Sequence, residues 1–371
     1  MLEAVRLRNA RNFSGGPGAL PEKILQQLHE SMLCVPEVGM SVLGISHRSA
    51  WFAEVVAEAE RNVRTLLGLR DGYQVLFLQG GATQQFFTFP MAFAHPGGPA
   101  PEYLHTGYWS GKALAAAGKD HRIEVAWSGK DAGFKVLPRA QELTLSPEAP
   151  YFHYISNETV DGVQFQETMG RDDVPRLCDM SSDFLSRPCE AQRYDLIYAH
   201  AQKNLGPAGV TVVVVRDELM NKVPVDRLPE FMDYRTHAAA HSIYNTPPVF
   251  AIYAVMLATR WLREDVGGLE KMDAINRRKA ELLYAAVDGS DGFYRGRADA
   301  AHRSIMNVVF NMATPEAETQ FLQASSQAGF SGLNGHRSVG GMRASLYNGV
   351  TIEAVEALVE FMHDYRKRHT A

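Results

Sequence analysis

Strand-like and helix-like patterns alternate along the first two thirds of the chain. Apolar residues at helical spacing predict helices over 21–33 and 51–69. Short apolar runs typical of buried strands follow, and each is separated from the next by a helical or turn segment. These runs are residues 73–79, 102–107, 122–127, 151–157, 175–181, 194–201 and 210–216. The alternation predicts an α/β fold with a mainly parallel central sheet covered by helices on both faces.

The last two apolar runs form an expected exception to the parallel order. YDLIYAHA (194–201) and VTVVVVR (210–216) are joined by a connection too short for a parallel crossover. We therefore expect these two strands to pair antiparallel.

The last third of the chain predicts a smaller α/β domain. Helical patterns over 247–266 and 268–288 meet at Gly267-Gly268, a typical breaker pair. Two strand patterns and two helical patterns follow, at 304–312, 342–348, 315–329 and 351–368. We expect a large domain over 17–266 and a small domain built from 1–16 and 267–371.

Composition and charge exclude several classes of protein. The chain has 371 residues, 46% hydrophobic and 21% charged, and a formal net charge of −5, which does not suggest a nucleic-acid binder. Its three cysteines form no C-x-x-C pair, so a reducing cytoplasm fits better than a disulfide scaffold. No secretory leader or membrane helix is expected. No metal-ligand spacing and no G-x-S-x-G elbow is present, so we expect no metal site.

Lys203, in AHAQKNLGPAG, is the first candidate for chemistry. Strand alternation, if it continues past residue 200, places Ala199, Ala201 and Lys203 on one face and His200 on the other. Burial and nearby positive charge can lower the pKa of a lysine until its amine forms a Schiff base with an aldehyde. A solvated lysine at the tip of a hairpin remains an alternative.

Other candidates gain weight only in combination with Lys203. Asp179 ends an apolar run, where a carboxylate at the carboxyl end of a strand can meet a cationic ligand. Gly80-Gly81 precede a helix whose first amides can hold a phosphate. Trp109 follows a short strand and can stack on a flat heterocycle. Taken singly, each has a plain structural explanation: a strand end, a turn, and a residue that caps the core.

Two further groups lie in turns. Thr159 belongs to the polar turn SNETVDG, and Asn245-Thr246 precede Pro247, where Thr246 is a good helix N-cap. Arginines accompany histidines in turns at His47-Arg48 and His336-Arg337, and Arg343 follows two glycines. Arginine suits carboxylate or phosphate, although a surface ion pair explains any one of these residues equally well.

Taken in order, the motifs resemble a known family over nearly the whole chain. They are FSGGPGALP, GISHRS, GYWS, HYISNETVDG, DMSSDFLSRP, YAHAQKNLGPAG, YNTPPVFAIY and GHRSVGGMRAS. The set is similar to the fold-type I, class V pyridoxal-phosphate-dependent aminotransferases, and within them to the phosphoserine aminotransferase family.

The resemblance implies a role for each candidate. Lys203 would be the catalytic residue that carries pyridoxal 5'-phosphate, Asp179 would hold its ring nitrogen, Trp109 would stack on the ring and Thr159 would bind its phenolic oxygen. The phosphate would be held by residues from two subunits of a homodimer, namely Ala82, Thr83 and Gln202 from one and Asn245 and Thr246 from the other. Substrate would be held by His47, Arg48, His336, Arg337 and Arg343.

The implied reaction is transfer of the amino group from glutamate to 3-phosphohydroxypyruvate in a cytoplasmic serine-biosynthesis enzyme, with the phosphohydroxythreonine step of vitamin B6 synthesis as a further possibility. Two positions depart from the family pattern. Some relatives have an arginine in place of Thr83, and a small residue is common in place of His200. Alternatives are an alanine–glyoxylate-type aminotransferase, a cysteine desulfurase, or a non-enzymatic binding module with this fold.

Overall fold

A seven-stranded sheet forms the centre of the molecule. We describe a computed structural model of the chain, which covers residues 9–224 and 226–370. The strands lie side by side in the order β1 (Tyr73–Gln79), β9 (Val210–Arg216), β8 (Leu196–His200), β7 (Arg176–Asp179), β4 (Phe152–Ile155), β2 (Glu102–His105) and β3 (Glu124–Ser128). Each predicted strand of the first two thirds is present, which confirms the α/β prediction.

Strand directions place one edge of the sheet at the site discussed below. β8, β7, β4, β2 and β3 pair parallel with one another, and β9 pairs antiparallel with both β8 and β1. The expected antiparallel exception is therefore confirmed. Because β1 and β8 both oppose β9, they run in the same direction, and their carboxyl ends reach the same edge.

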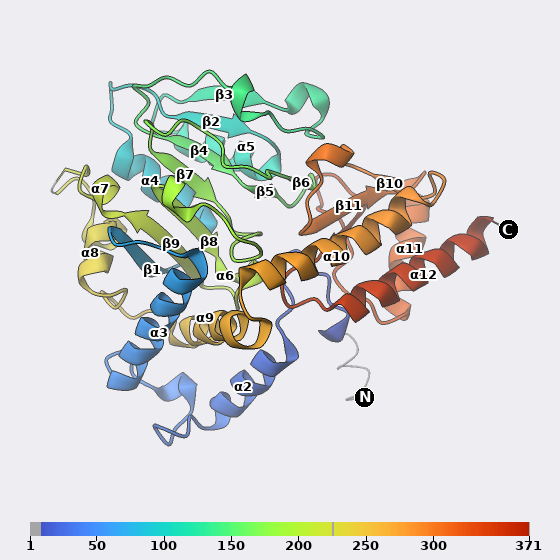
Figure 1. Ribbon diagram of the computed structural model, residues 1–371, viewed down its shortest axis with the longest axis horizontal. Coiled ribbons are helices and arrows are strands. Elements are labelled where there is room, and N and C mark those ends of the chain that lie inside the picture. Colours follow the sequence, from blue (N-terminus) through green and yellow to red (C-terminus); the bar gives the residue numbers. More distant parts are fainter. Residues whose placement is uncertain (1–8, 225, 371) are drawn as a thin grey trace.

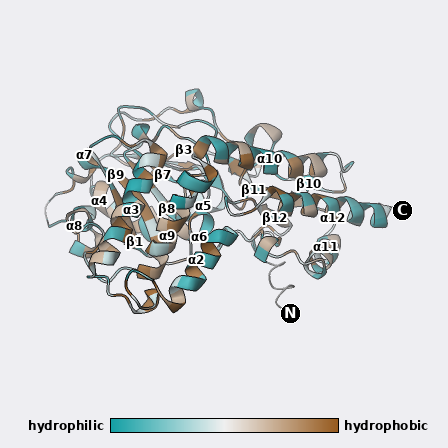
Figure 2. Cartoon of the chain, turned by 60° about the horizontal axis from the view of Figure 1, so that its bottom comes forward, coloured by the Kyte–Doolittle hydropathy of each residue, from teal (hydrophilic) through white to brown (hydrophobic). Residues whose placement is uncertain are grey.

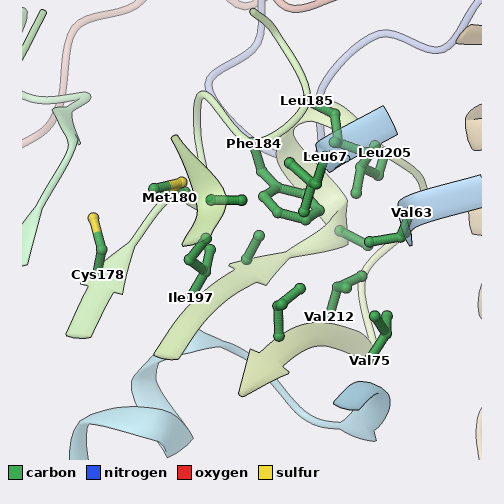
Figure 3. Packing of buried hydrophobic residues seen from close by; sticks show 14 of the residues in the cluster. Val63, Leu67, Val75, Cys178, Met180, Phe184, Leu185, Ile197, Leu205 and Val212 are labelled. Carbon is green, nitrogen blue, oxygen red and sulfur yellow. The ribbon is translucent and has the colours of Figure 1, made fainter. Parts of the chain in front are cut away.

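Both faces of the sheet are buried, which explains the unbroken apolar runs. Successive residues of a strand alternate between faces. Val212 and Val214 of β9 belong to one hydrophobic cluster, while Val213 and Val215 belong to the cluster on the opposite face. Figure 3 shows the first cluster, where Val212 lies close to side chains from other strands and from helix α3. In Figure 2 the strands are mostly brown and the surrounding helices carry much of the teal, hydrophilic surface.

Helices cover each face of the sheet (Figure 1). The first cluster takes side chains from α2 (Glu22–Leu33), α3 (Ala50–Leu67) and α9 (Val249–Trp261). The second takes side chains from α4 (Ala82–Phe93), α5 (Tyr108–Ala117), α7 (Asp217–Met220) and α8 (Tyr234–Ala239). Within the described residues, no helix is long and apolar enough to cross a membrane.

A second, smaller layer lies beside the large sheet, at the right of Figure 1. Its three strands are β10 (Arg295–Gly296), β11 (Asn307–Asn311) and β12 (Met342–Ser345), which pair antiparallel. Its helices are α10 (Leu269–Asp288), α11 (Pro315–Gln327) and α12 (Ile352–Thr370). Phe13 packs in the same hydrophobic cluster as these elements. The exact division into 17–266 and 1–16 with 267–371 stays a prediction, and its residues 1–8 lie outside the described residues.

A buried lysine ties α10 to the loop that follows β12. The Lys279 side chain is fully buried, and its ammonium donates to the carbonyl oxygens of Leu346, Tyr347 and Val350 at 2.9, 2.8 and 2.9 Å. Burial lowers the pKa of Lys279 to about 7. The three acceptors favour the charged form, because only an ammonium can donate three hydrogen bonds. The loop itself reaches the active-site segment, since the Asn348 amide donates to Asn204 Oδ1 at 2.8 Å.

We expect Lys279→Met to destabilise the fold. The substitution keeps an apolar stem of similar size but removes three buried hydrogen bonds. Among the described residues, only the Tyr347 carbonyl retains a second donor, the Val350 amide, and the cost is about 3 kcal/mol. Thermal unfolding should show a melting temperature several degrees lower. Lys271→Met, on the exposed side of the same helix, is the matched control. Equal melting temperatures for the two variants would contradict the role given to Lys279.

Candidate active site

The carboxyl ends of several strands bring chemistry-bearing residues together at one edge of the sheet. Gly80-Gly81 follow β1, Trp109 lies just after β2, Asp179 is the last residue of β7, and His200 is the last residue of β8. Ligands of open α/β sheets bind at this edge, because the loops there are free to diverge.

A cavity of about 200 Å³ lies among these strand ends. Six of the predicted cofactor-binding residues line the cavity. They are Ala82, Thr83, Trp109, Asp179, Gln202 and Lys203. They come from four separate stretches of sequence. The structure thus brings together the residues that the motifs suggested, and their individual roles remain predictions.

Lys203 lies in a one-turn helix rather than at the tip of a hairpin. β8 ends at His200, and α6 (Ala201–Asn204) begins at once. The assumption that strand alternation continues past residue 200 is therefore wrong, because the backbone turns helical at Ala201. His200 does not face away from Lys203, since both side chains line the cavity.

The electrostatic environment of Lys203 favours a reactive amine. Burial lowers the pKa of Lys203, and the guanidinium of Arg343 acts in the same direction, while the Asp179 carboxylate opposes them. Its Nζ lies 5.3 Å from the centre of the Trp109 ring. An amine with a lowered pKa is unprotonated in a larger fraction of molecules, so it is available as a nucleophile and as a base.

Asp179 is a buried carboxylate that lines the cavity. Its Oδ1 accepts the Ser181 amide at 2.8 Å. Burial raises the pKa of Asp179, and the charge of Lys203 limits that rise. A protonated ring nitrogen in the cavity would supply the cationic partner that a buried carboxylate needs.

The start of α5, which carries Trp109, is held by two carboxylates that our sequence analysis did not single out. Glu158 accepts the amides of Trp109 and Ser110 at 3.0 and 2.8 Å, and Asp161 accepts the Tyr108 amide at 2.9 Å. These amides belong to the first helical turn, where intrahelical acceptors are missing. The sequence offered one indication of this role, namely two acidic residues close to Thr159 in SNETVDG. Acidic residues are equally common in ordinary turns.

Thr159 contacts the predicted stacking residue directly. Its hydroxyl oxygen accepts the indole N–H of Trp109 at 3.0 Å, which leaves the hydroxyl proton free to be donated elsewhere. The carbonyl oxygen of Thr159 accepts a long hydrogen bond of 3.5 Å from the Arg343 guanidinium. The same turn therefore fixes both the indole and the arginine.

Arg343 reaches the site from the small sheet. It lies on β12, and burial lowers its pKa. Its Nε is buried without a hydrogen-bond partner in the described structure, so the guanidinium can take an anionic ligand. The glycines of FSGGPGALP make room for it and for Lys203. A Cβ atom added to Gly15 would lie 2.2 Å from Arg343 Nη2, and one added to Gly18 would lie 2.3 Å from the Lys203 carbonyl oxygen.

The second His-Arg pair lies close to the indole. The His336 ring centre is 4.5 Å from that of Tyr108 and 6.5 Å from that of Trp109. Arg337 is exposed, and within the described residues it makes no hydrogen bond or ion pair. His336 therefore lies beside the start of α5, and Arg337 follows it directly in the chain.

The remaining candidates gather elsewhere on the same protomer. His47 and Thr246 line a separate open pocket, and the Arg48 guanidinium donates to the carbonyl oxygens of Ile243 and Tyr244 at 3.0 and 3.4 Å. Neither these residues nor Asn245 line the Lys203 cavity. The prediction that Thr246 caps a helix is wrong, because Pro247-Pro248 delay the start of α9 to Val249 and no side-chain cap forms.

Comparison with known proteins places this site in a family. The sequence model of the class-V aminotransferase family matches residues 11–358 of the chain. The chain therefore belongs to the class-V aminotransferases and, within them, to the phosphoserine aminotransferase family. A phosphoserine aminotransferase of Rhodopirellula baltica is 43% identical over 360 residues, which are 97% of this chain and 96% of the relative.

Solved structures agree with this result. The phosphoserine aminotransferase of Bacillus circulans subsp. alkalophilus is 45% identical with a TM-score of 0.93, over 96% of this chain and 98% of that one. A pyridoxal-phosphate-bound phosphoserine aminotransferase of Trichomonas vaginalis is 37% identical with a TM-score of 0.88, over 95% and 99% of the two chains. The resemblance drawn from the motifs is confirmed.

The pKa of Glu158 makes its contribution to stability testable. Burial, with the neighbouring charge of Asp161, raises the pKa of Glu158 to about 7 from 4.5. Between these values the folded state binds the extra proton, so the free energy of unfolding falls as the pH rises, by up to about 1.4 kcal/mol per pH unit. Glu158→Gln does not titrate and should lack this component.

The measurement is thermal unfolding of the wild-type protein and Glu158→Gln at pH 5, 6 and 7. We expect the melting temperature of the wild-type protein to decline relative to that of Glu158→Gln across this range. Glu148→Gln, at an exposed position, should keep a constant offset from the wild-type protein. A constant offset for Glu158→Gln as well would show that Glu158 ionises in the same way in the folded and unfolded chains.

Proposed function

We propose that this protein is a pyridoxal-phosphate-dependent enzyme that transfers the amino group of glutamate to 3-phosphohydroxypyruvate, forming O-phosphoserine and 2-oxoglutarate in serine biosynthesis. One observation carries the proposal: Lys203, Asp179 and Trp109 line a single cavity at the carboxyl edge of the sheet. Membership in the phosphoserine aminotransferase family supports this reaction over others that the same fold supports.

The residues around the cavity fit the cofactor. The carboxylate of Asp179 can accept a hydrogen bond from a protonated pyridine nitrogen, and the Trp109 indole is held firmly enough to stack on the ring. The amides of Ala82 and Thr83 open α4, whose N-cap is Gly81, and with the side chain of Gln202 they suit a phosphate. When bound, pyridoxal phosphate supplies an electron sink for the bond broken at the substrate carbon.

The protein's part in the reaction is to bind, orient and move protons. The Lys203 amine would take up the proton that leaves the substrate α-carbon and later give it back, acting first as a base and then as an acid. Its lowered pKa suits this task, since a lysine with an ordinary pKa would stay protonated near neutral pH. Arg343 would hold the substrate carboxylate, because its charge acts on Lys203 and its Nε is buried without a partner among the described residues.

The substrate's second anionic group would meet the two His-Arg pairs. The His336 ring lies near Trp109 on the same protomer, and the next residue, Arg337, is not engaged in an ion pair within the described residues. One pocket must accept both the side-chain carboxylate of glutamate and a phosphate. Exposed arginines suit both anions, because their charge is permanent and their side chains can adjust.

A homodimer would explain the position of the remaining candidates. His47, Arg48, Asn245 and Thr246 lie outside the Lys203 cavity, so we propose that they serve the cavity of the partner subunit. Exposed apolar side chains occur in the segment that precedes His47 in the sequence. They are Met32, Leu33, Met40 and Leu43. Apolar side chains gathered at such exposed positions favour a covered face over an open one. A cytoplasmic location stays part of the proposal and rests on cysteine usage.

The cysteine desulfurase alternative lacks a suitable thiol. Such an enzyme needs a reactive cysteine near the cofactor. Burial raises the pKa of the Cys178 thiol well above its usual value and that of Cys189 to about 12, so both favour the unreactive protonated form. Cys34 is exposed on the segment that follows α2.

Substrate preference tests the proposal. In single-turnover experiments with the aminated cofactor form, we expect 3-phosphohydroxypyruvate to react much faster than pyruvate or glyoxylate. Arg337→Ala or Arg48→Ala should reduce the rate for the phosphorylated acid by about 10- to 100-fold, since each removes a charged hydrogen bond. Arg70→Ala, at an exposed position after the end of α3, is the control.

Equal rates for the three acceptors in the wild-type protein would contradict the assignment and favour an aminotransferase of another specificity. A protein that takes up no pyridoxal phosphate would favour the binding-module alternative.

A further inference from the structure

We propose that His200 is a further cofactor-positioning residue, whose Nδ1–H donates to the phosphate group of pyridoxal phosphate at the start of α4. The proposal rests on the proposed function and adds a residue to its cofactor site. It concerns a position that departs from the family pattern, where a small residue is common.

The ring of His200 lies against the start of α4. His200 ends β8, and its side chain lines the cavity together with Gly81, Ala82 and Thr83. A Cβ atom added to Gly81 would lie 3.0 Å from Cε1 of His200 and 3.1 Å from Nδ1. The glycine therefore gives the imidazole space to approach the helix N-cap. Any phosphate bound by the first amides of α4 would be a neighbour of this edge of the ring.

The hydrogen bonds of the ring indicate which nitrogen carries the proton. The Gly209 amide donates to His200 Nε2 at 3.5 Å, so Nε2 acts as an acceptor. A neutral imidazole then carries its proton on Nδ1. Among the described residues Nδ1 has no hydrogen-bond partner, and it is the ring nitrogen nearer to Gly81, at 3.1 Å from an added Cβ atom against 3.5 Å for Nε2. The backbone is fixed as well, since the His200 amide donates to the Ser181 hydroxyl at 3.1 Å.

The surroundings of the His200 ring favour its neutral form. Burial lowers the pKa of His200 to about 4, and the charge of Lys203 contributes to the lowering. A neutral ring is a donor at Nδ1 and an acceptor at Nε2, which matches the surroundings just described. It can therefore bind a phosphate across the neutral pH range without first gaining a proton.

The cavity needs such a donor. Among the residues that line it, Lys203 is the one cationic side chain, and its amine is reserved for the covalent link to the cofactor. The N-cap of α4 is a glycine that provides no side-chain donor. On this protomer the phosphate would thus depend on backbone amides, on the polar side chains of Thr83 and Gln202, and on His200.

The test compares two ligands that differ by the phosphate alone. Dissociation constants of pyridoxal phosphate and of pyridoxal are measured on the cofactor-free protein by quenching of tryptophan fluorescence. We expect His200→Ala to raise the dissociation constant of pyridoxal phosphate by about 10- to 100-fold, because a hydrogen bond to a charged group is lost. The dissociation constant of pyridoxal should not change. His200→Gln retains a side-chain N–H and should recover part of the affinity. His29→Ala, at an exposed position on α2, is the control.

Each result is decisive. Wild-type affinity of His200→Ala for pyridoxal phosphate would overturn the proposal, and so would an equal loss for both ligands, which would indicate a contact with the ring. If His200→Ala does not fold, the dissociation constants of pyridoxal phosphate and pyridoxal are compared in His200→Ser, whose side chain is too short to reach α4. A wild-type protein that binds neither ligand would overturn the proposed function itself.

Discussion

The site depends on one constraint: an amine and a carboxylate must be held together away from bulk water. Parallel pairing of β7 with β8 sets Asp179 and the residues after His200 at adjacent strand ends. The one-turn helix α6 then presents Lys203 to the same cavity. Burial lowers the pKa of Lys203 and raises that of Asp179, so each group favours its neutral form, while their mutual attraction favours both charges. A ligand that carries a cationic ring nitrogen and an aldehyde would satisfy both groups.

The small sheet contributes Arg343 to the site that lies at the strand ends of the large sheet. Arg343 of β12 reaches over the turn at Thr159, and the backbone of Gly15 passes within contact of its guanidinium. The loop after β12 is held by hydrogen bonds with α10 and α6. The Lys279 ammonium donates to its Tyr347 carbonyl oxygen, and its Asn348 amide donates to Asn204, the residue after Lys203. The small layer therefore contacts both the turn at Thr159 and the helix that carries Lys203.

Most of the fold and the centre of the site could be predicted from the sequence, because periodicity and turn residues are local. β1 and β9 begin and end at the predicted residues. The predictions that were wrong concern features that depend on the tertiary structure. Strand alternation could not reveal that the backbone turns helical after His200, and the propensity of Thr246 for capping could not reveal a helix delayed by two prolines. Glu158 was missed because its partners are amides about 50 residues away in the chain.

The central claim is that the Lys203 amine forms the covalent link to the cofactor, and chemical trapping measures this most directly. The protein is loaded with pyridoxal phosphate, reduced with borohydride, digested, and mapped by mass spectrometry. The account predicts a pyridoxyl group on the peptide that contains Lys203, and its absence from Lys203→Ala. A label on another lysine, or one spread over exposed lysines such as Lys271, would contradict it.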